Sequence, residues 1–247
     1  MSKRTSESAR ARVAAMREAQ RRQERRRRIA MIVTVVLIVI LAAGIGWWTV
    51  QRGQSEEVTG LAPITVQSDG SVVMAQPGVE APVVDVYEDF QCPVCKEFGK
   101  TSGSTLKNLA KEGKAKVVYH VLTIFGQDPT RSNSIRAAAA ARCVTDGVKW
   151  MEYHEKLYEE QPRETVSGFA IDDLVKWGKE VGITDPGFES CVRDQKHAAE
   201  HEKYSEQTIN SAQIGGTPTV KVNGQEVPNE IIFVPSELRR AILEAGK

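Results

Sequence analysis

Residues 29–50 form an uninterrupted apolar segment, IAMIVTVVLIVILAAGIGWWTV, without a charged side chain. A helix rises about 1.5 Å per residue, so a segment of this length spans a hydrocarbon core of roughly 30 Å. The alternative is a cleaved secretory signal, which has a shorter apolar core and a small-residue cleavage site. Trp47 and Trp48 instead suit an anchor at the membrane interface. We therefore expect one retained transmembrane helix over residues 29–50.

Charge is distributed unequally on the two sides of this segment. Residues 1–28 carry eleven Lys or Arg side chains and three Asp or Glu, whereas the remainder of the chain is net acidic. Basic residues flank the cytoplasmic end of membrane helices, so we predict a basic cytoplasmic tail over residues 1–28 and an extracytoplasmic domain beyond the membrane. The tail lacks the interleaved aromatic side chains of many nucleic-acid sites, and we expect no nucleic-acid partner.

The exported part is predicted to hold a linker over residues 51–62 and one mixed α/β domain over residues 63–247. Its first half follows the order strand, helix, strand that is typical of a parallel crossover unit. The elements expected there are a hairpin about Asp69-Gly70, a strand over 83–87, a helix over 95–111 and a strand over 116–125.

Helical patterns dominate from about residue 130 to 212. We expect an Ala-rich helix capped by Ser132 or Asn133 and ending near Asp146-Gly147, followed by helices over residues 150–160 and 171–182. A fourth helix starts at Asp185-Pro186, with a possible continuation to Ile209. Strands return at residues 217–222 and, after an Asn-Gly turn, at residues 225–227, and a last helix begins at residue 235.

Cys92 and Cys95 follow the first central strand in the stretch EDFQCPVCKEF. A zinc site needs about four ligands, and the two remaining cysteines, Cys143 and Cys191, are 48 positions apart and form no second close pair, so we expect no metal here. An inert disulfide is possible in an oxidising compartment, but a purely structural disulfide does not require both sulfurs at the start of a helix.

Redox chemistry explains this placement better. Pro93 suits the first turn of a helix, where its missing N–H is not needed. The free N–H groups at that end favour a thiolate, so we expect Cys92 to be an exposed attacking sulfur with a lowered pKa. Cys95, one turn further on, is expected to resolve the mixed disulfide.

Gly216-Thr217-Pro218 precedes a later strand. Pro218 is a candidate for a cis peptide bond, which would leave the backbone of Thr217 free to pair with an extended substrate beside Cys92. Taken alone, the same residues are also compatible with an ordinary loop proline.

Together these features resemble the DsbA-like thiol:disulfide oxidoreductases of the thioredoxin superfamily, specifically the membrane-anchored type. The matching stretches are YEDFQCPVC at residues 87–95, YHEKLYEEQP at residues 153–162 and GTPT at residues 216–219. The resemblance implies a thioredoxin-like fold with a helical insertion at about 130–212, unfolded exported proteins as substrates, and a membrane reoxidase of the DsbB or vitamin K epoxide reductase type. It implies no organic cofactor.

The chain departs from that family at two positions. Val94 stands where the best-known members have histidine and cannot stabilise the thiolate, which predicts a milder oxidant. Val86 stands where the family often has a buried acid. Asp85 or Glu88 could substitute for that acid, but we favour the interpretation that both are charges at a strand end.

Cys143 and Cys191 are an even leftover pair outside the cytoplasm, which favours a structural disulfide, as in some relatives that the chain resembles. Two buried free thiols are the alternative. His197 and His201 are four positions apart on one helix, beside Glu200 and Glu202, and we expect a solvated face there and no metal.

The sequence therefore predicts an extracytoplasmic thiol:disulfide oxidoreductase that oxidises cysteines of exported proteins. Two alternatives stay open: a reductant or disulfide isomerase on the same scaffold, and a non-catalytic thioredoxin-like binding module.

Overall fold

The computed structural model describes residues 60–247. The predicted tail, the transmembrane helix and almost all of the linker lie outside the described residues. Within residues 60–247, no helix has both the length and the apolar character needed to cross a membrane.

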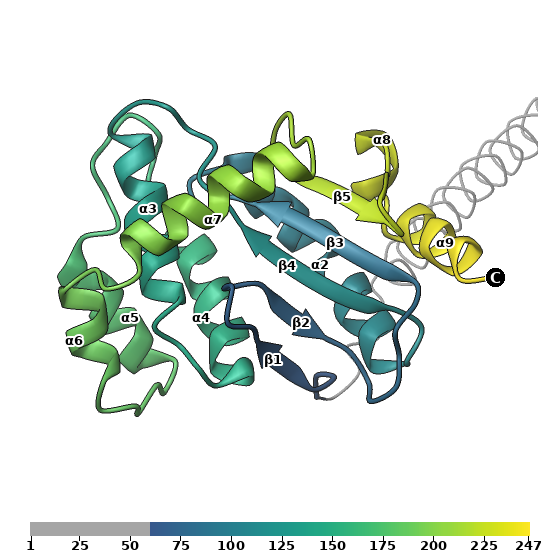
Figure 1. Cartoon of the computed structure of the whole chain (residues 1–247), viewed down its shortest axis with the longest axis horizontal. Coiled ribbons are helices and arrows are strands. Elements are labelled where there is room, and N and C mark those ends of the chain that lie inside the picture. Colours follow the sequence, from purple (N-terminus) through teal and green to yellow (C-terminus); the bar gives the residue numbers. More distant parts are fainter. Residues whose placement is uncertain (1–59) are drawn as a thin grey trace, which may run out of the picture. The chain divides into compact units, whose positions relative to one another are not determined.

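The core of the domain is a six-stranded mixed sheet with the order β1-β2-β4-β3-β5-β6 (Figure 1). The strands are β1 (Ile64–Val66), β2 (Val72–Met74), β3 (Val83–Glu88), β4 (Lys116–Val121), β5 (Thr219–Val222) and β6 (Gln225–Glu226). β3 and β4 are parallel, and the other neighbouring strands are antiparallel. The mixed α/β fold and both hairpins are confirmed.

The long helix α2 (Pro93–Lys111) connects β3 to β4. β3 lies between β4 and β5, so Val84 and Val86 are fully buried, and Val86 pairs with Tyr119 on one side and Val220 on the other. Because successive side chains of a strand point to opposite faces, Glu88, two positions after Val86, lies on the same face as Val86. The carboxyl end of β3 leads directly into the start of α2.

A helical insertion separates β4 from β5. It contains α3 (Thr130–Ala141), α4 (Gly147–Glu159), α5 (Ile171–Glu180), α6 (Phe188–Arg193) and α7 (Ala198–Ser211). The chain ends with α8 (Asn229–Ile232) and α9 (Pro235–Ala245) after the last hairpin. In Figure 1, α7 crosses one face of the sheet while α2 lies behind it.

Three predicted boundaries are wrong. Asp146 does not end the Ala-rich helix, since its side chain accepts the N–H of Lys149 and caps the start of α4. Ser132 and Asn133 lie inside α3 and do not cap it. The helix expected over 185–209 is two helices, because Gln195 adopts a left-handed backbone with φ of 46° between them.

The second central strand also ends earlier than predicted, at Val121. The N–H of Thr123 donates to the hydroxyl of Ser205 at 2.8 Å, and the N–H of Ile124 donates to the carboxylate of Asp89 at 2.9 Å. Side chains, not a neighbouring strand, therefore satisfy the backbone beyond β4.

Candidate functional site

Cys92 and Cys95 are free thiols at the start of α2. Cys92 is the residue that caps the helix, with Pro93 following in its first turn. The N–H of Cys95 donates to the Cys92 sulfur at 3.4 Å, and the Cys92 thiol donates to the carbonyl of Thr217 at 3.3 Å. A sulfur in the capping position receives the N–H groups that a helix start leaves unpaired.

The two thiols have opposite acidities. A hydrogen bond from the Cys95 side chain is the largest cause that lowers the pKa of Cys92, to about 6; burial opposes it, and the Thr217 side chain and two backbone N–H groups support it. Burial raises the pKa of Cys95, and the negative charge of Cys92 raises it further. Only one sulfur of the pair is therefore readily ionised, as nucleophilic attack by one member requires.

The Cys92 side chain is less accessible than predicted. Only 4% of the residue is exposed, and Cys95 is fully buried, whereas Val94 between them is half exposed. The expectation of an exposed attacking sulfur is wrong for this conformation, because the chain around Thr217-Pro218 lies against Cys92.

Gln161, which follows α4, holds the loop before Cys92 in place. Its side-chain amide donates to the carbonyls of Phe90 at 2.7 Å and Cys92 at 2.9 Å. In return, the Gln91 side chain donates to the carbonyl of Pro162 at 2.9 Å. The helical insertion thus fixes the backbone that carries the Cys92 sulfur.

Asp89 also fixes the loop before Cys92. Its buried carboxylate accepts the N–H of Gln91 at 2.8 Å, the hydroxyl of Ser134 at 2.6 Å and the N–H of Ile124 at 2.9 Å. Burial is the main reason that the pKa of Asp89 is raised to about 6. One carboxylate therefore joins the cysteine loop, the segment after β4 and α3.

Thr217 and Pro218 come to the cysteines from far along the chain. The peptide bond between them is cis. The carbonyl of Thr217 faces the Cys92 sulfur, and its hydroxyl is buried. The fold thus brings together four of the residues singled out from the sequence: Cys92, Cys95, Thr217 and Pro218.

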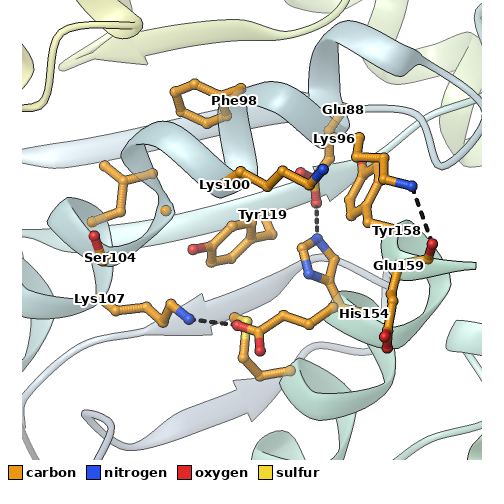
Figure 2. Close-up of a pocket in the computed structure, with 15 residues that line it drawn as sticks. Glu88, Lys96, Phe98, Lys100, Ser104, Lys107, Tyr119, His154, Tyr158 and Glu159 are labelled. Carbon is orange, nitrogen blue, oxygen red and sulfur yellow. Dashed lines mark hydrogen bonds and ion pairs between the residues drawn. The ribbon is translucent and has the colours of Figure 1, made fainter. Parts of the chain in front are cut away.

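Glu88 is not a charge at an exposed strand end, as the sequence suggested. It is 3% exposed, and its carboxylate lies 2.5 Å from Nε2 of His154 on α4 (Figure 2). His154 also stacks against Trp150 at 5.0 Å between ring centres. A buried charge needs such a partner, and the register of β3 provides it by pointing Glu88 toward α4.

A cavity of about 440 Å³ opens beside this pair, between α2 and α4. Nδ1 of His154 and the hydroxyl of Tyr158, which both line it, are buried and have no hydrogen-bond partner within residues 60–247. Lys96, Lys100 and Lys107 line its α2 side (Figure 2).

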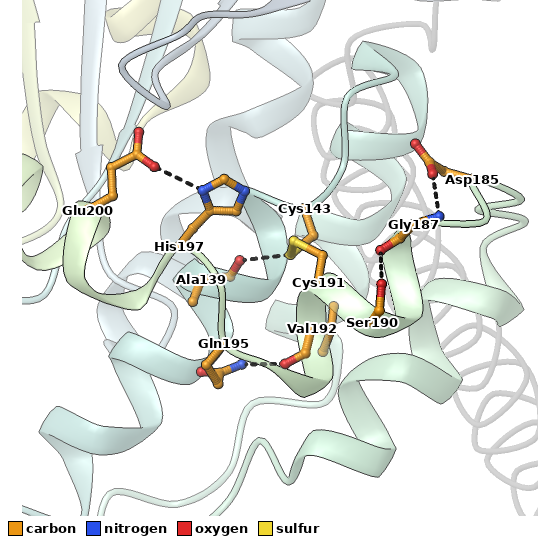
Figure 3. Close-up of a disulfide and its surroundings, with 10 residues drawn as sticks. All are labelled: Ala139, Cys143, Asp185, Gly187, Ser190, Cys191, Val192, Gln195, His197 and Glu200. Atoms are coloured by element: carbon orange, nitrogen blue, oxygen red, sulfur yellow. Dashed lines mark hydrogen bonds and ion pairs between the residues drawn. A yellow bond between two sulfur atoms is a disulfide. The ribbon is translucent and has the colours of Figure 1, made fainter.

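Cys143 and Cys191 form a disulfide in the helical insertion (Figure 3). It connects the segment after α3 to α6, away from the free thiols in sequence. His201 is not on a solvated face: it is 1% exposed and bonded to the Thr123 hydroxyl at 2.9 Å. Only His197 of that histidine pair is partly exposed.

Sequence reasoning missed Asp89, Gln161 and the pairing of Glu88 with His154. Two acids at the end of an apolar strand were a usable signal, because strands that enter a core rarely end in two charges without partners. Gln161 gave no such signal, since its role depends on where α4 ends in space.

Comparison with known proteins places the chain among thioredoxins. The family model Thioredoxin_4, described as thioredoxin, matches residues 74–242. This range runs from β2 to α9 and includes both free cysteines, the helical insertion and Thr217-Pro218.

Two solved structures from Mycobacterium tuberculosis share the fold. The reduced disulfide bond oxidoreductase DsbG is 28% identical with a TM-score of 0.60, over 74% of this chain and 86% of DsbG. Reduced DsbA is 27% identical with a TM-score of 0.58, over 76% of this chain and 94% of DsbA.

A curated relative, the serine/threonine-protein kinase PknE of Mycobacterium tuberculosis, is 25% identical over 167 residues. The alignment covers 64% of this chain but only 29% of the kinase. The chain therefore corresponds to less than a third of that relative. With its family match and its two solved relatives, the chain belongs to the thioredoxin family and is a DsbA-like member of it.

Proposed function

We propose that this protein is a membrane-anchored oxidase that introduces disulfides into unfolded proteins outside the cytoplasm. The observation that carries the proposal is the position of the Cys92 sulfur, which caps α2 and lies 3.3 Å from the Thr217 carbonyl. The membrane anchor and the topology rest on the apolar segment at residues 29–50 and the basic tail before it.

The cycle begins with the Cys92–Cys95 disulfide. A substrate thiolate attacks the Cys92 sulfur, a mixed disulfide forms, and Cys95 leaves with the electron pair and takes up a proton. A second substrate thiolate then attacks the substrate sulfur of the mixed disulfide and displaces Cys92 as a thiolate. The substrate has lost two electrons and two protons, and the enzyme is the dithiol seen here.

Each residue of the site has a part in this cycle. The low pKa of Cys92 makes it a good leaving group in the second step. The raised pKa of Cys95 keeps it protonated after the first step. The backbone of Thr217 is positioned to pair with an extended substrate, and a membrane reoxidase of the DsbB or vitamin K epoxide reductase type restores the disulfide.

The full-length protein in detergent should oxidise and refold a reduced, unfolded protein that needs disulfides. Cys92→Ala should abolish this activity, and Cys95→Ala should trap a covalent mixed disulfide with the substrate. A Cys92→Ala variant with unchanged activity in cells would instead support the non-catalytic binding module.

The direction of the reaction is tested by equilibrating the dithiol with glutathione. We expect a reduction potential clearly above that of thioredoxin, about −270 mV, although below the most oxidising relatives because Val94 adds no charge. A value near that of thioredoxin would instead favour a reductant. The reductant is the second candidate because Val94, between the cysteines, cannot stabilise the Cys92 thiolate.

A further inference from the structure

The disulfide in the helical insertion has an imidazole beside it. The sulfurs of Cys143 and Cys191 and a ring nitrogen of His197 lie within 4.8 Å of one another. Cys143 follows α3, Cys191 is in α6, and His197 precedes α7, so three separate elements converge at this point (Figure 3).

The His197 ring is held in a fixed orientation by a carboxylate. Its Nδ1 lies 2.9 Å from Oε2 of Glu200, and Arg142 donates to the other carboxylate oxygen at 3.3 Å. Figure 3 shows the carboxylate on one side of the ring and the disulfide on the other. With Nδ1 engaged, Nε2 is the nitrogen left for a further ligand.

The pairing of the imidazole with a carboxylate is one that zinc sites use. Metal-binding histidines nearly always give their second nitrogen to a carboxylate or carbonyl, which sets the tautomer and orients the ring. We propose that Cys143, Cys191 and Nε2 of His197 form a zinc site in the chain whose two cysteines are reduced. The site itself does not depend on the redox activity of Cys92 and Cys95, whereas the time at which it fills rests on the proposed export of the domain.

The distances suit zinc once the sulfurs are no longer bonded. Zinc lies about 2.3 Å from sulfur and about 2.0–2.1 Å from imidazole nitrogen, which sets tetrahedral ligands roughly 3.5–3.8 Å apart. The three ligand atoms are already within 4.8 Å, and the two cysteine Cα atoms are 5.9 Å apart. Rotation of the cysteine side chains can therefore open the site without moving the helices.

Charge and protons also balance. Binding releases one proton from each thiol, and the two thiolates neutralise the zinc ion. Glu200 keeps its own partner in Arg142. Cys191 and His197 are partly exposed, so solvent can reach the fourth coordination position.

The disulfide and the metal exclude each other, because a disulfide offers no thiolate. A chain that leaves the cytoplasm does so with reduced cysteines, so zinc can occupy this site only until the disulfide forms. No reductant is needed, because zinc binds before the disulfide forms. The site would hold α3, α6 and α7 together during that interval.

The test uses the full-length protein in detergent with Cys92→Ser and Cys95→Ser, so that the other dithiol contributes no ligand. After reduction with a phosphine and its removal, the protein is titrated with zinc against a chromophoric chelator. We expect one zinc per chain, no zinc on the oxidised protein, and thiolate-to-metal absorption when cobalt replaces zinc.

Variants separate this site from adventitious thiol binding. His197→Ala should weaken zinc binding at least tenfold, and Glu200→Gln by about 10–100-fold through the lost orientation of the ring. Glu202→Gln, two positions further on the same helix, is the matched control and should bind as the parent does.

Two results would overturn the proposal. One is equal zinc affinity in the His197→Ala variant and its parent. The other is a reduced protein that has lost its circular dichroism spectrum and does not regain it when zinc is added.

Discussion

The acidity of Cys92 can be measured directly through its rate of alkylation as a function of pH. With a pKa of about 6, roughly nine in ten Cys92 side chains are thiolates at pH 7, against about one in a hundred for a thiol at the reference value of 9.0. The thiolate population is therefore about 90 times larger than in an ordinary cysteine.

The rate does not rise by that whole factor. A thiolate loses nucleophilicity as its pKa falls, with a Brønsted slope of about 0.4–0.5, so a shift of three units slows each thiolate roughly 20-fold. The net expectation is a reaction about four to five times faster than that of an ordinary thiol at pH 7, and slower than an ordinary thiol above about pH 8.

The same shift bears on the stability of the reduced protein. A thiol whose pKa is lowered by folding contributes stability that is full above the unfolded pKa of about 9 and is lost as the pH falls through about 6. At pH 7 the contribution is at most about 1.4 kcal/mol, since solvent screens part of it. This free energy corresponds to about 30 mV of reduction potential.

The assay is alkylation of the reduced full-length protein with iodoacetamide from pH 4 to 10, followed by mass spectrometry of the Cys92 peptide. The rate should fall tenfold per pH unit below pH 6 and level off above pH 7. In Cys95→Ala, which removes the largest cause of the low pKa, the midpoint should move toward 9. A midpoint between 8 and 9 in both proteins would refute the reasoning.

Three further changes test the surroundings of the site. Gln161→Ala removes two hydrogen bonds to the cysteine loop and should lower the free energy of unfolding by about 1–3 kcal/mol in urea titrations. His154→Ala leaves the Glu88 carboxylate buried without its partner and should lower it by about 3–5 kcal/mol, with Glu88→Gln restoring part of the loss in the double variant. Replacing Cys143 and Cys191 together by serine should destabilise the oxidised protein by about 4 kcal/mol, because the disulfide closes a long loop of the unfolded chain.

Matched controls accompany these variants. Gln207→Ala on the exposed side of α7 should change the free energy of unfolding by less than about 0.5 kcal/mol, as surface substitutions usually do. If Gln207→Ala lowers the free energy of unfolding as much as Gln161→Ala does, the effect of Gln161→Ala does not arise from its two hydrogen bonds to the cysteine loop. An oxidised serine double variant as stable as its parent would contradict the role of the disulfide.

The fold could be predicted where the signal is local. The Asp-Gly and Asn-Gly turns, the apolar strand before Cys92 and the proline after it each act within a few residues, and each is in the structure where expected. Asp146 shows the limit of local signals. An aspartate before a glycine suits a helix end and a helix start equally, and the neighbouring helices decide between them.

The site could be predicted only in part, because several of its contacts join residues that are far apart in the sequence. The relation of Cys92 to Cys95 depends on one turn of helix, whereas Glu88 and His154 are 66 positions apart and Gln161 lies 69 positions from the carbonyl it binds. These partners depend on the docking of α4 against the sheet. The proximity of His197 to the second cysteine pair likewise appears only after three helices have packed.

The contact of Gln161 with the cysteine loop has a consequence for protein engineering. Exchanging the helical insertion between relatives, or trimming it to obtain a smaller protein, replaces more than the helices α3 to α7. It also removes the amide that sets the path of the backbone at the reactive thiol. A functional chimera must therefore take the end of α4 and the CPVC segment from the same parent protein.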